Sequence, residues 1–171
     1  MAGDASNIPV WLTGDVFIAN PTIAFVTATH VPADVDTALH AIWLPLGLMK
    51  GDPGAEFTRD IDKTDVPSWQ QGRVLTRYKN GKVDGTINLL EENTSIELIV
   101  QKAKVPKPLK TYVAFEFANE DGALERRFTK MPAHIWAATD HRQEDVNGRE
   151  VTLTYYPVGT DIFTILEGTP A

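Results

Sequence analysis

The sequence predicts a mainly β protein, an antiparallel β-sandwich or barrel with one short α-helix and long loops. Short runs of alternating apolar and polar residues recur along the chain, as half-buried strands require. Gly, Asn and Asp gather between these runs, where turns use them. The 171 residues are expected to form one domain, 1–171, with extended loops near 20–41 and 101–110.

The first strand is expected at Val10–Ile18, broken by a turn at Gly14-Asp15. A second short helix is expected near Asp36, on the strength of an apolar side formed by Leu39, Ile42 and Trp43. Charged residues are sparse before Gly51. This weakly charged third of the chain is expected to pack either on the chain's own core or on a neighbouring subunit.

Ala55–Val66 alternates with period two and predicts a strand with two unlike faces. One face carries Phe57, Arg59, Ile61 and Lys63. The other is read as strongly acidic and carries Glu56, Thr58, Asp60 and Asp62.

A long β-type run, Arg73–Glu91, follows and is interrupted at Asn80-Gly81. Asn-Gly favours a hairpin, because a type I′ turn needs positive φ at both central residues. A bulge within one long, bent strand is the alternative. The two readings place the following residues in different strands, and both stay open at this point.

The helix is expected from Thr94, with Thr94 as N-cap, Glu97 completing a capping box and Pro106 preventing continuation. Thr111–Ala118 then alternates, with Val113, Phe115 and Phe117 predicted to point inward. The remaining strands are expected at Leu124–Lys130, His134–Thr139, Arg149–Tyr156 and Asp161–Leu166.

Composition excludes several classes of function. The net charge of −7 disfavours ordinary nucleic-acid binding, because an acidic surface repels phosphates. The chain has no cysteine, so disulfides, thiolate zinc sites and cysteine nucleophiles are excluded. The longest apolar stretch, Ala41–Met49, contains Pro45 and Gly47 and is too short to span a membrane, so no membrane partner is expected.

No catalytic pattern emerges from the polar residues. No serine sits in a Gly-x-Ser-x-Gly elbow, and no two histidines have the i, i+4 spacing of a zinc helix. Asp60 and Asp62 lie on one face of one strand, unlike the opposed carboxyls of a glycosidase. We therefore expect no enzyme, no catalytic residue, no cofactor and no metal.

Two groups of residues are candidates for contacts between subunits. The basic segment with Lys102, Lys104 and Lys107 is either a solvated linker or a contact with an acidic neighbour. The tryptophans at 11, 43, 69 and 136 suit a core or a subunit interface. The resulting candidates are Trp11, Trp43, Trp69, Lys102, Lys104 and Lys107, while Trp69 or Trp136 as a sugar platform is the alternative.

Six segments of the chain are informative when they are taken together, in their order along the sequence. They are an opening strand at Trp11–Ala19, a Trp-x-x-Leu-Gly turn at Trp43–Gly47, Asp60–Arg73 with its Trp-Gln-x-Gly, a strand-to-helix junction at Ile87–Asn93, a late hairpin from Thr111 to Phe128, and a closing strand at Val151–Pro157. In this order, they resemble segments of the major tail tube proteins of long-tailed (siphovirus-type) bacteriophages. The resemblance covers nearly the whole chain, except 20–40 and 101–110.

This resemblance implies a structural virion protein, neither an enzyme nor a cofactor binder. Hexameric rings of β-sandwiches would stack into a hollow tail tube that conducts DNA into the host. The implied partners are other copies of the chain and the tape-measure, terminator and baseplate proteins, first in the host cytoplasm and then in the virion. A tail terminator or connector ring and a carbohydrate-binding β-sandwich are the alternatives.

The same implication suggests a role for the acidic strand face. A channel must let DNA pass without holding it, and like-charge repulsion achieves this. We therefore expect Glu56, Thr58, Asp60 and Asp62 to line the lumen. A solvated outer face is the rival explanation.

Overall fold

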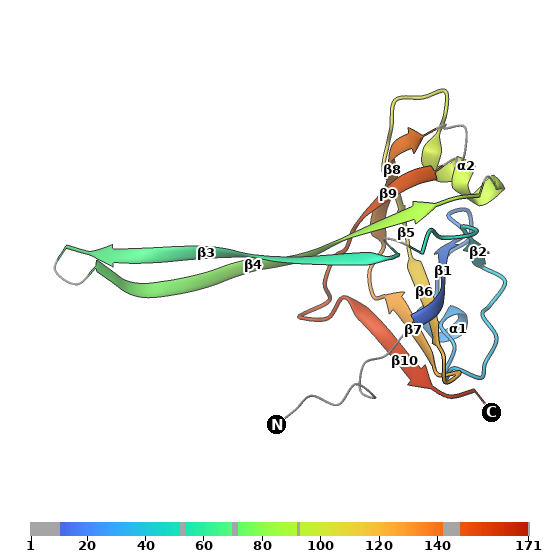
Figure 1. Ribbon diagram of the computed structural model, residues 1–171, viewed down its shortest axis with the longest axis horizontal. Helices are drawn as coiled ribbons and strands as arrows, with labels where there is room; N and C mark the ends of the chain where they lie inside the picture. The colour runs from blue at the N-terminus through green and yellow to red at the C-terminus, as the bar shows by residue number, and fades with distance from the viewer. Residues whose placement is uncertain (1–10, 52–53, 70–71, 92, 142–147, 171) are drawn as a thin grey trace.

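Two antiparallel sheets of five strands each make up the protein (Figure 1). The computed structural model describes residues 11–51, 54–69, 72–91, 93–141 and 148–170. In these residues it contains ten strands and two short helices, so the predicted mainly β fold class is confirmed.

The first sheet, here sheet A, is ordered β10-β7-β6-β1-β2. Its strands are β10 (Phe163–Gly168), β7 (Leu124–Thr129), β6 (Val113–Asn119), β1 (Trp11–Ala19) and β2 (Trp43–Pro45). Sheet B is ordered β3-β4-β9-β8-β5. Its strands are β3 (Glu56–Ser68), β4 (Gly72–Leu89), β9 (Gly148–Thr154), β8 (Ala133–His141) and β5 (Leu109–Thr111).

The main core lies between the sheets. Val16 and Phe115 of sheet A are buried in the same cluster as Ile87 and Leu153 of sheet B. Val113 and Phe115 are buried and Phe117 packs against the same core, which confirms their predicted inward direction. Burying one such apolar side chain stabilises the folded state by roughly 1.5–3 kcal/mol. The inward-facing residues are therefore a main source of the protein's stability.

Strand β1 is continuous, and the predicted turn at Gly14-Asp15 is wrong. Gly14 pairs with Phe117 across the sheet. A Cβ at Gly14 would lie 2.9 Å from Cε of Met49 and 3.1 Å from the Phe117 ring. This glycine therefore serves close packing within a strand rather than a turn.

A second, smaller core covers the outer face of sheet A. Its buried members are Ala19, Ile42, Trp43, Ala114 and Phe128, and the segment between β1 and β2 supplies further apolar side chains. That segment, 20–42, also receives a hydrogen bond, from Arg126 to the Thr37 carbonyl. The weakly charged part of the chain thus packs in large part on its own core.

No helix forms near Asp36, where the sequence predicted one. The Asp34 carboxylate instead accepts hydrogen bonds from the backbone N–H (2.8 Å) and hydroxyl (2.7 Å) of Thr37. This local turn competes with a helix. The helix of this region is α1 (Thr27–His30), and Trp43 belongs to strand β2.

Helix α2 (Thr94–Val100) lies at one end of the main core, where Ile96 and Ile99 are buried. Its N-cap is Asn93, whose side-chain oxygen accepts a 2.9 Å hydrogen bond from the Ile96 N–H. The predicted capping box at Thr94 and Glu97 is therefore wrong by one residue. The helix itself is confirmed.

A two-stranded arm projects from the body (Figure 1). Strand β4 pairs with β9 only from Asp84 to Leu89, while β3 and β4 pair along the whole hairpin. We call residues 58–83 the arm. Strand β4 runs unbroken through Asn80, which has φ of 53° at a register shift, so the bulge reading is correct and the hairpin reading wrong.

Candidate functional site

The arm exposes several large apolar side chains to solvent. Its exposed large apolar residues are Ile61, Val66, Trp69, Leu75 and Tyr78. Trp69 lies where the arm reverses direction, and its side chain is fully exposed. A two-stranded hairpin is marginally stable alone, and its apolar side chains favour a partner surface.

The candidate lumen residues lie on the face of sheet B that points away from the core. Phe57, between Glu56 and Thr58, packs on Phe115 with ring centroids 5.1 Å apart. Side chains alternate along a strand, so Glu56, Thr58, Asp60 and Asp62 lie on the opposite face, and all four are exposed. Their role as a channel lining stays a prediction.

This face is less acidic than strand β3 alone suggests. Asp60 lies opposite Lys82, with carboxylate and ammonium 3.3 Å apart. Asp62 lies opposite Lys79 and accepts a 2.9 Å hydrogen bond from Asn80. The register thus places Lys79 and Lys82 of β4 beside two carboxylates of β3, and it adds Asp84 opposite Thr58, so this face has a mixed charge in which acids outnumber lysines.

The polar face continues across the sheet from the root of the arm. Glu56 pairs with Thr86, and Thr86 with Thr152, which in turn pairs with Trp136. The residues toward the middle of the sheet, Thr86, Thr152 and Trp136, are half-buried. Sheet B therefore presents a hydroxyl-rich outer surface, opposite an apolar inner one.

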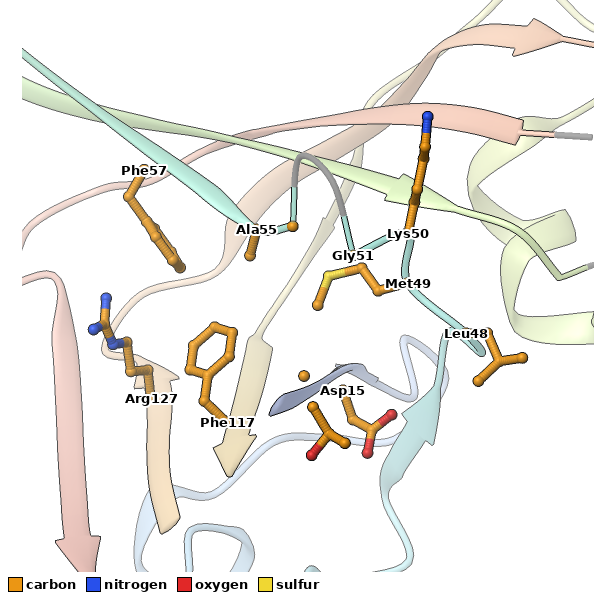
Figure 2. Close-up of a pocket in the computed structure, with 12 residues that line it drawn as sticks. Asp15, Leu48, Met49, Lys50, Gly51, Ala55, Phe57, Phe117 and Arg127 are labelled. Carbon is orange, nitrogen blue, oxygen red and sulfur yellow. The ribbon is translucent and has the colours of Figure 1, made fainter. Parts of the chain in front are cut away.

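A pocket of about 680 Å³ lies at the root of the arm (Figure 2). Strands β1, β3, β6 and β7 and the loop before β3 contribute to its wall. Its apolar and aromatic lining residues are Leu48, Met49, Ala55, Phe57 and Phe117, and its charged ones are Asp15, Lys50 and Arg127. Because these residues are far apart in sequence, no local pattern indicated the pocket.

The cationic side of the pocket is built around Arg127. Its guanidinium carbon lies 5.0 Å from the ring centroid of Phe57 and 5.7 Å from that of Phe117. Glu125 forms an ion pair with the same guanidinium. These contacts hold the planar cation against two aromatic rings, an arrangement that suits another aromatic ring or an anion.

Asp15 also belongs to the pocket lining, but its side chain lies beside Glu116 on the outer face of sheet A, because Gly14 and Val16 face the core. Burial, followed by the nearby Glu116 carboxylate, raises the pKa of Asp15 above its ordinary value. The pocket thus combines apolar walls with the Arg127 guanidinium, an arrangement that can bind a side chain or a small group.

The other predicted contact residues are scattered. Trp43 is 5% exposed and donates a 2.8 Å hydrogen bond to the His30 carbonyl, so it belongs to the second core and not to an outer surface. Trp11 begins β1, and its side chain lies outside what the structure describes. Lys102, Lys104 and Lys107 are exposed beyond the end of α2.

The described residues contain no group of three or more His, Asp or Glu side chains placed to hold a metal ion. None of their helices has the length and apolar character of a membrane span.

No family model matches the chain, and no curated protein matches it. Among solved structures, it is similar to a chain of the sheath–tube complex of an extracellular contractile injection system (PVC) in the extended state. That alignment has 10% identity and a TM-score of 0.47 and covers 98% of this chain and 99% of the other.

Two further solved structures are similar. The sheath/tube terminator of the PVC system aligns at 12% identity and a TM-score of 0.44, covering 96% of this chain and 99% of the other. The tube-terminating cap of the anti-feeding prophage aligns at 15% identity and a TM-score of 0.44, covering 85% and 95%.

Proposed function

We propose that this chain is a structural subunit of a hollow tail tube, of the kind found in long-tailed phages and related particles. Hexameric rings of the β-sandwich would stack, and DNA would pass through the channel. The proposal rests above all on the arm, a projecting hairpin whose exposed apolar side chains need another molecule to cover them.

Sheet edges support the same proposal. In the described residues, β10 and β2 end sheet A, and β3 and β5 end sheet B, each with one unpaired side. Unpaired strands invite pairing with another chain unless they are covered. Joining such edges around a ring would close them into one barrel, which removes the exposed edges altogether.

The outer face of sheet B is our proposed channel lining. It combines the exposed Glu56, Thr58, Asp60 and Asp62 with half-buried hydroxyls such as Thr86 and Thr152. Carboxylates only partly balanced by Lys79 and Lys82 would not attract a phosphate backbone. DNA would then slide past without a fixed binding site.

The proposed role is structural, with no catalysis and no cofactor. Its partners would be other copies of the chain and the tape-measure, terminator and baseplate proteins, in the host cytoplasm during assembly and in the particle afterwards. Contact between rings is head-to-tail and does not close, so it produces a filament.

Electron microscopy of the purified chain over a range of concentrations tests the proposal. We expect tubes of uniform width with a central channel, and a reconstruction in which Glu56 and Asp60 point into that channel. Isolated rings that never stack would favour the terminator reading. A strictly monomeric protein that binds glycans would favour the carbohydrate-binding reading and contradict ours.

A further inference from the structure

We propose that the pocket at the root of the arm binds Trp69 from the arm tip of a second copy. This inference rests on the proposed function, since it requires copies of the chain to assemble. It assigns a ligand to the pocket and a role to the most exposed aromatic residue of the described chain.

Trp69 is suited to be the inserted group. It is the one tryptophan among the described side chains that is fully exposed, while Trp43 is buried and Trp136 half-buried. A large aromatic ring in water is unfavourable, and buried tryptophans often dominate the binding energy of interfaces. Because Trp69 lies at the end of a projecting hairpin, its ring is accessible to a neighbouring molecule.

The pocket offers the chemistry that an indole ring requires. Phe57, Phe117 and Met49 form apolar walls, and the Arg127 guanidinium lies over both phenylalanine rings. A cation beside an aromatic ring and a thioether beside its edge both favour such a ring. Figure 2 shows these side chains around one common space.

Asp15 lines the same pocket, but its side chain does not face these walls. Gly14 and Val16 face the core, so alternation places Asp15 beside Glu116 on the outer face of sheet A. The pocket therefore offers apolar walls and one cation, which suit the face of an indole ring.

The position of the pocket decides that the tryptophan comes from another copy. The pocket is lined by Ala55 and Phe57 at the start of β3, whereas Trp69 directly follows the other end of that strand. Figure 1 shows that β3 and β4 extend far from the body. Each chain thus carries one tip and one pocket, too far apart to meet within the chain. Tip-into-pocket contacts between successive copies would link subunits head-to-tail.

Two variants with opposite defects test the inference on the full chain. Trp69→Ala removes the tip, while Leu48→Glu places a charge at the pocket rim, where Leu48 is 61% exposed. We expect each variant alone to need about tenfold or more protein to assemble than wild type, as loss of an anchor side chain does. Val158→Glu, the same kind of change at a site that is 50% exposed and lies outside both the pocket and the predicted contact residues, is the control and should assemble normally.

A mixture of the two variants separates this contact from other assembly contacts. Tagged Leu48→Glu protein keeps its tip and Trp69→Ala protein keeps its pocket, so the first should capture the second in a pull-down. Tagged Trp69→Ala protein should not capture untagged Trp69→Ala protein. Thermal unfolding of each variant within about 1 °C of wild type would show that both stay folded.

The possible failures are distinguishable. If wild-type protein stays monomeric at every concentration, the proposed function fails and the pocket assignment with it. If wild type forms tubes and Trp69→Ala forms them equally well, only the pocket assignment is overturned. If Leu48→Glu blocks assembly and Trp69→Ala does not, the pocket receives a different segment or ligand, which also overturns the assignment.

Discussion

The side-chain amide of Asn80 donates a 2.9 Å hydrogen bond to Oδ2 of Asp62 across the arm. Asn80 also has a left-handed backbone with φ of 53°, at the point where the pairing register of β3 and β4 shifts. One residue therefore sets the backbone shape of the bulge and joins the two strands there.

Replacing Asn80 separates these two roles. Asn80→Gly keeps the left-handed backbone accessible and loses only the hydrogen bond, whereas Asn80→Val adds strain of about 1–2 kcal/mol. We expect amide exchange in the arm to be faster in both variants, and fastest in Asn80→Val. Exchange in the body strands β6 and β9 should stay unchanged, and equal exchange of the arm in all three proteins would contradict this account.

Gly47 is expected to tolerate no side chain. Its φ is 85°, and a Cβ there would overlap the Glu91 side chain. Gly47→Ala should therefore lower the free energy of unfolding by roughly 2–4 kcal/mol, measured by urea denaturation. Gly148→Ala is the matched control, since a Cβ at Gly148 meets nothing within 4 Å, and it should change stability by less than about 0.5 kcal/mol.

Tyr155 has a buried hydroxyl that makes no hydrogen bond to any described residue. Burial raises the pKa of this phenol, so the group stays neutral at ordinary pH. Tyr155→Phe removes an unsatisfied polar group and should leave stability unchanged or raise it by about 1 kcal/mol. A loss above about 1 kcal/mol would show that the hydroxyl has a partner, such as bound water.

Tyr156→Phe is the neighbouring comparison. The Tyr156 hydroxyl lies 2.8 Å from Nδ1 of His134, and its residue is exposed. Removing this hydroxyl should lower stability by roughly 0.5–1 kcal/mol. Thermal unfolding should thus show a lower Tm for Tyr156→Phe and an unchanged or higher Tm for Tyr155→Phe.

Asp34 should make the stability of the protein depend on acidic pH. Hydrogen bonds from Thr37 hold the pKa of this carboxyl below its ordinary value of 3.8. A group with a lowered folded-state pKa contributes stability at neutral pH, which is lost as the pH falls through that lowered value. We expect Asp34→Ala to lower Tm at pH 7, and the difference from wild type to shrink below about pH 4.

Asp34→Asn distinguishes charge from hydrogen bonding in this turn. It keeps an acceptor oxygen for the Thr37 N–H, so Tm should fall less than in Asp34→Ala. If Tm at pH 7 falls by the same amount in both variants, the negative charge of Asp34, and not its hydrogen bonds, stabilises the protein. A constant difference between Asp34→Ala and wild type from pH 7 to pH 3 would contradict the lowered pKa.

Part of the candidate site was visible in the sequence. Alternation predicts one strand face with Glu56, Thr58, Asp60 and Asp62, and the sequence also predicts Trp69 as a contact residue, which suits its full exposure. The pocket could not be found this way. Phe57, Phe117 and Arg127 belong to three different strands, and only the pairing of those strands brings them together.

Local pattern by itself determined the fold class, the strand at Val113–Phe117 and the existence of the helix after Asn93. These depend on alternation and end signals within a few residues, which a sequence displays directly. The tertiary structure alone decided that Gly14 packs inside a strand, that Asn80 forms a bulge and not a turn, and that Lys82 neutralises Asp60. Each of these outcomes depends on a residue distant in the chain, because register and close approach are set by the partner strand.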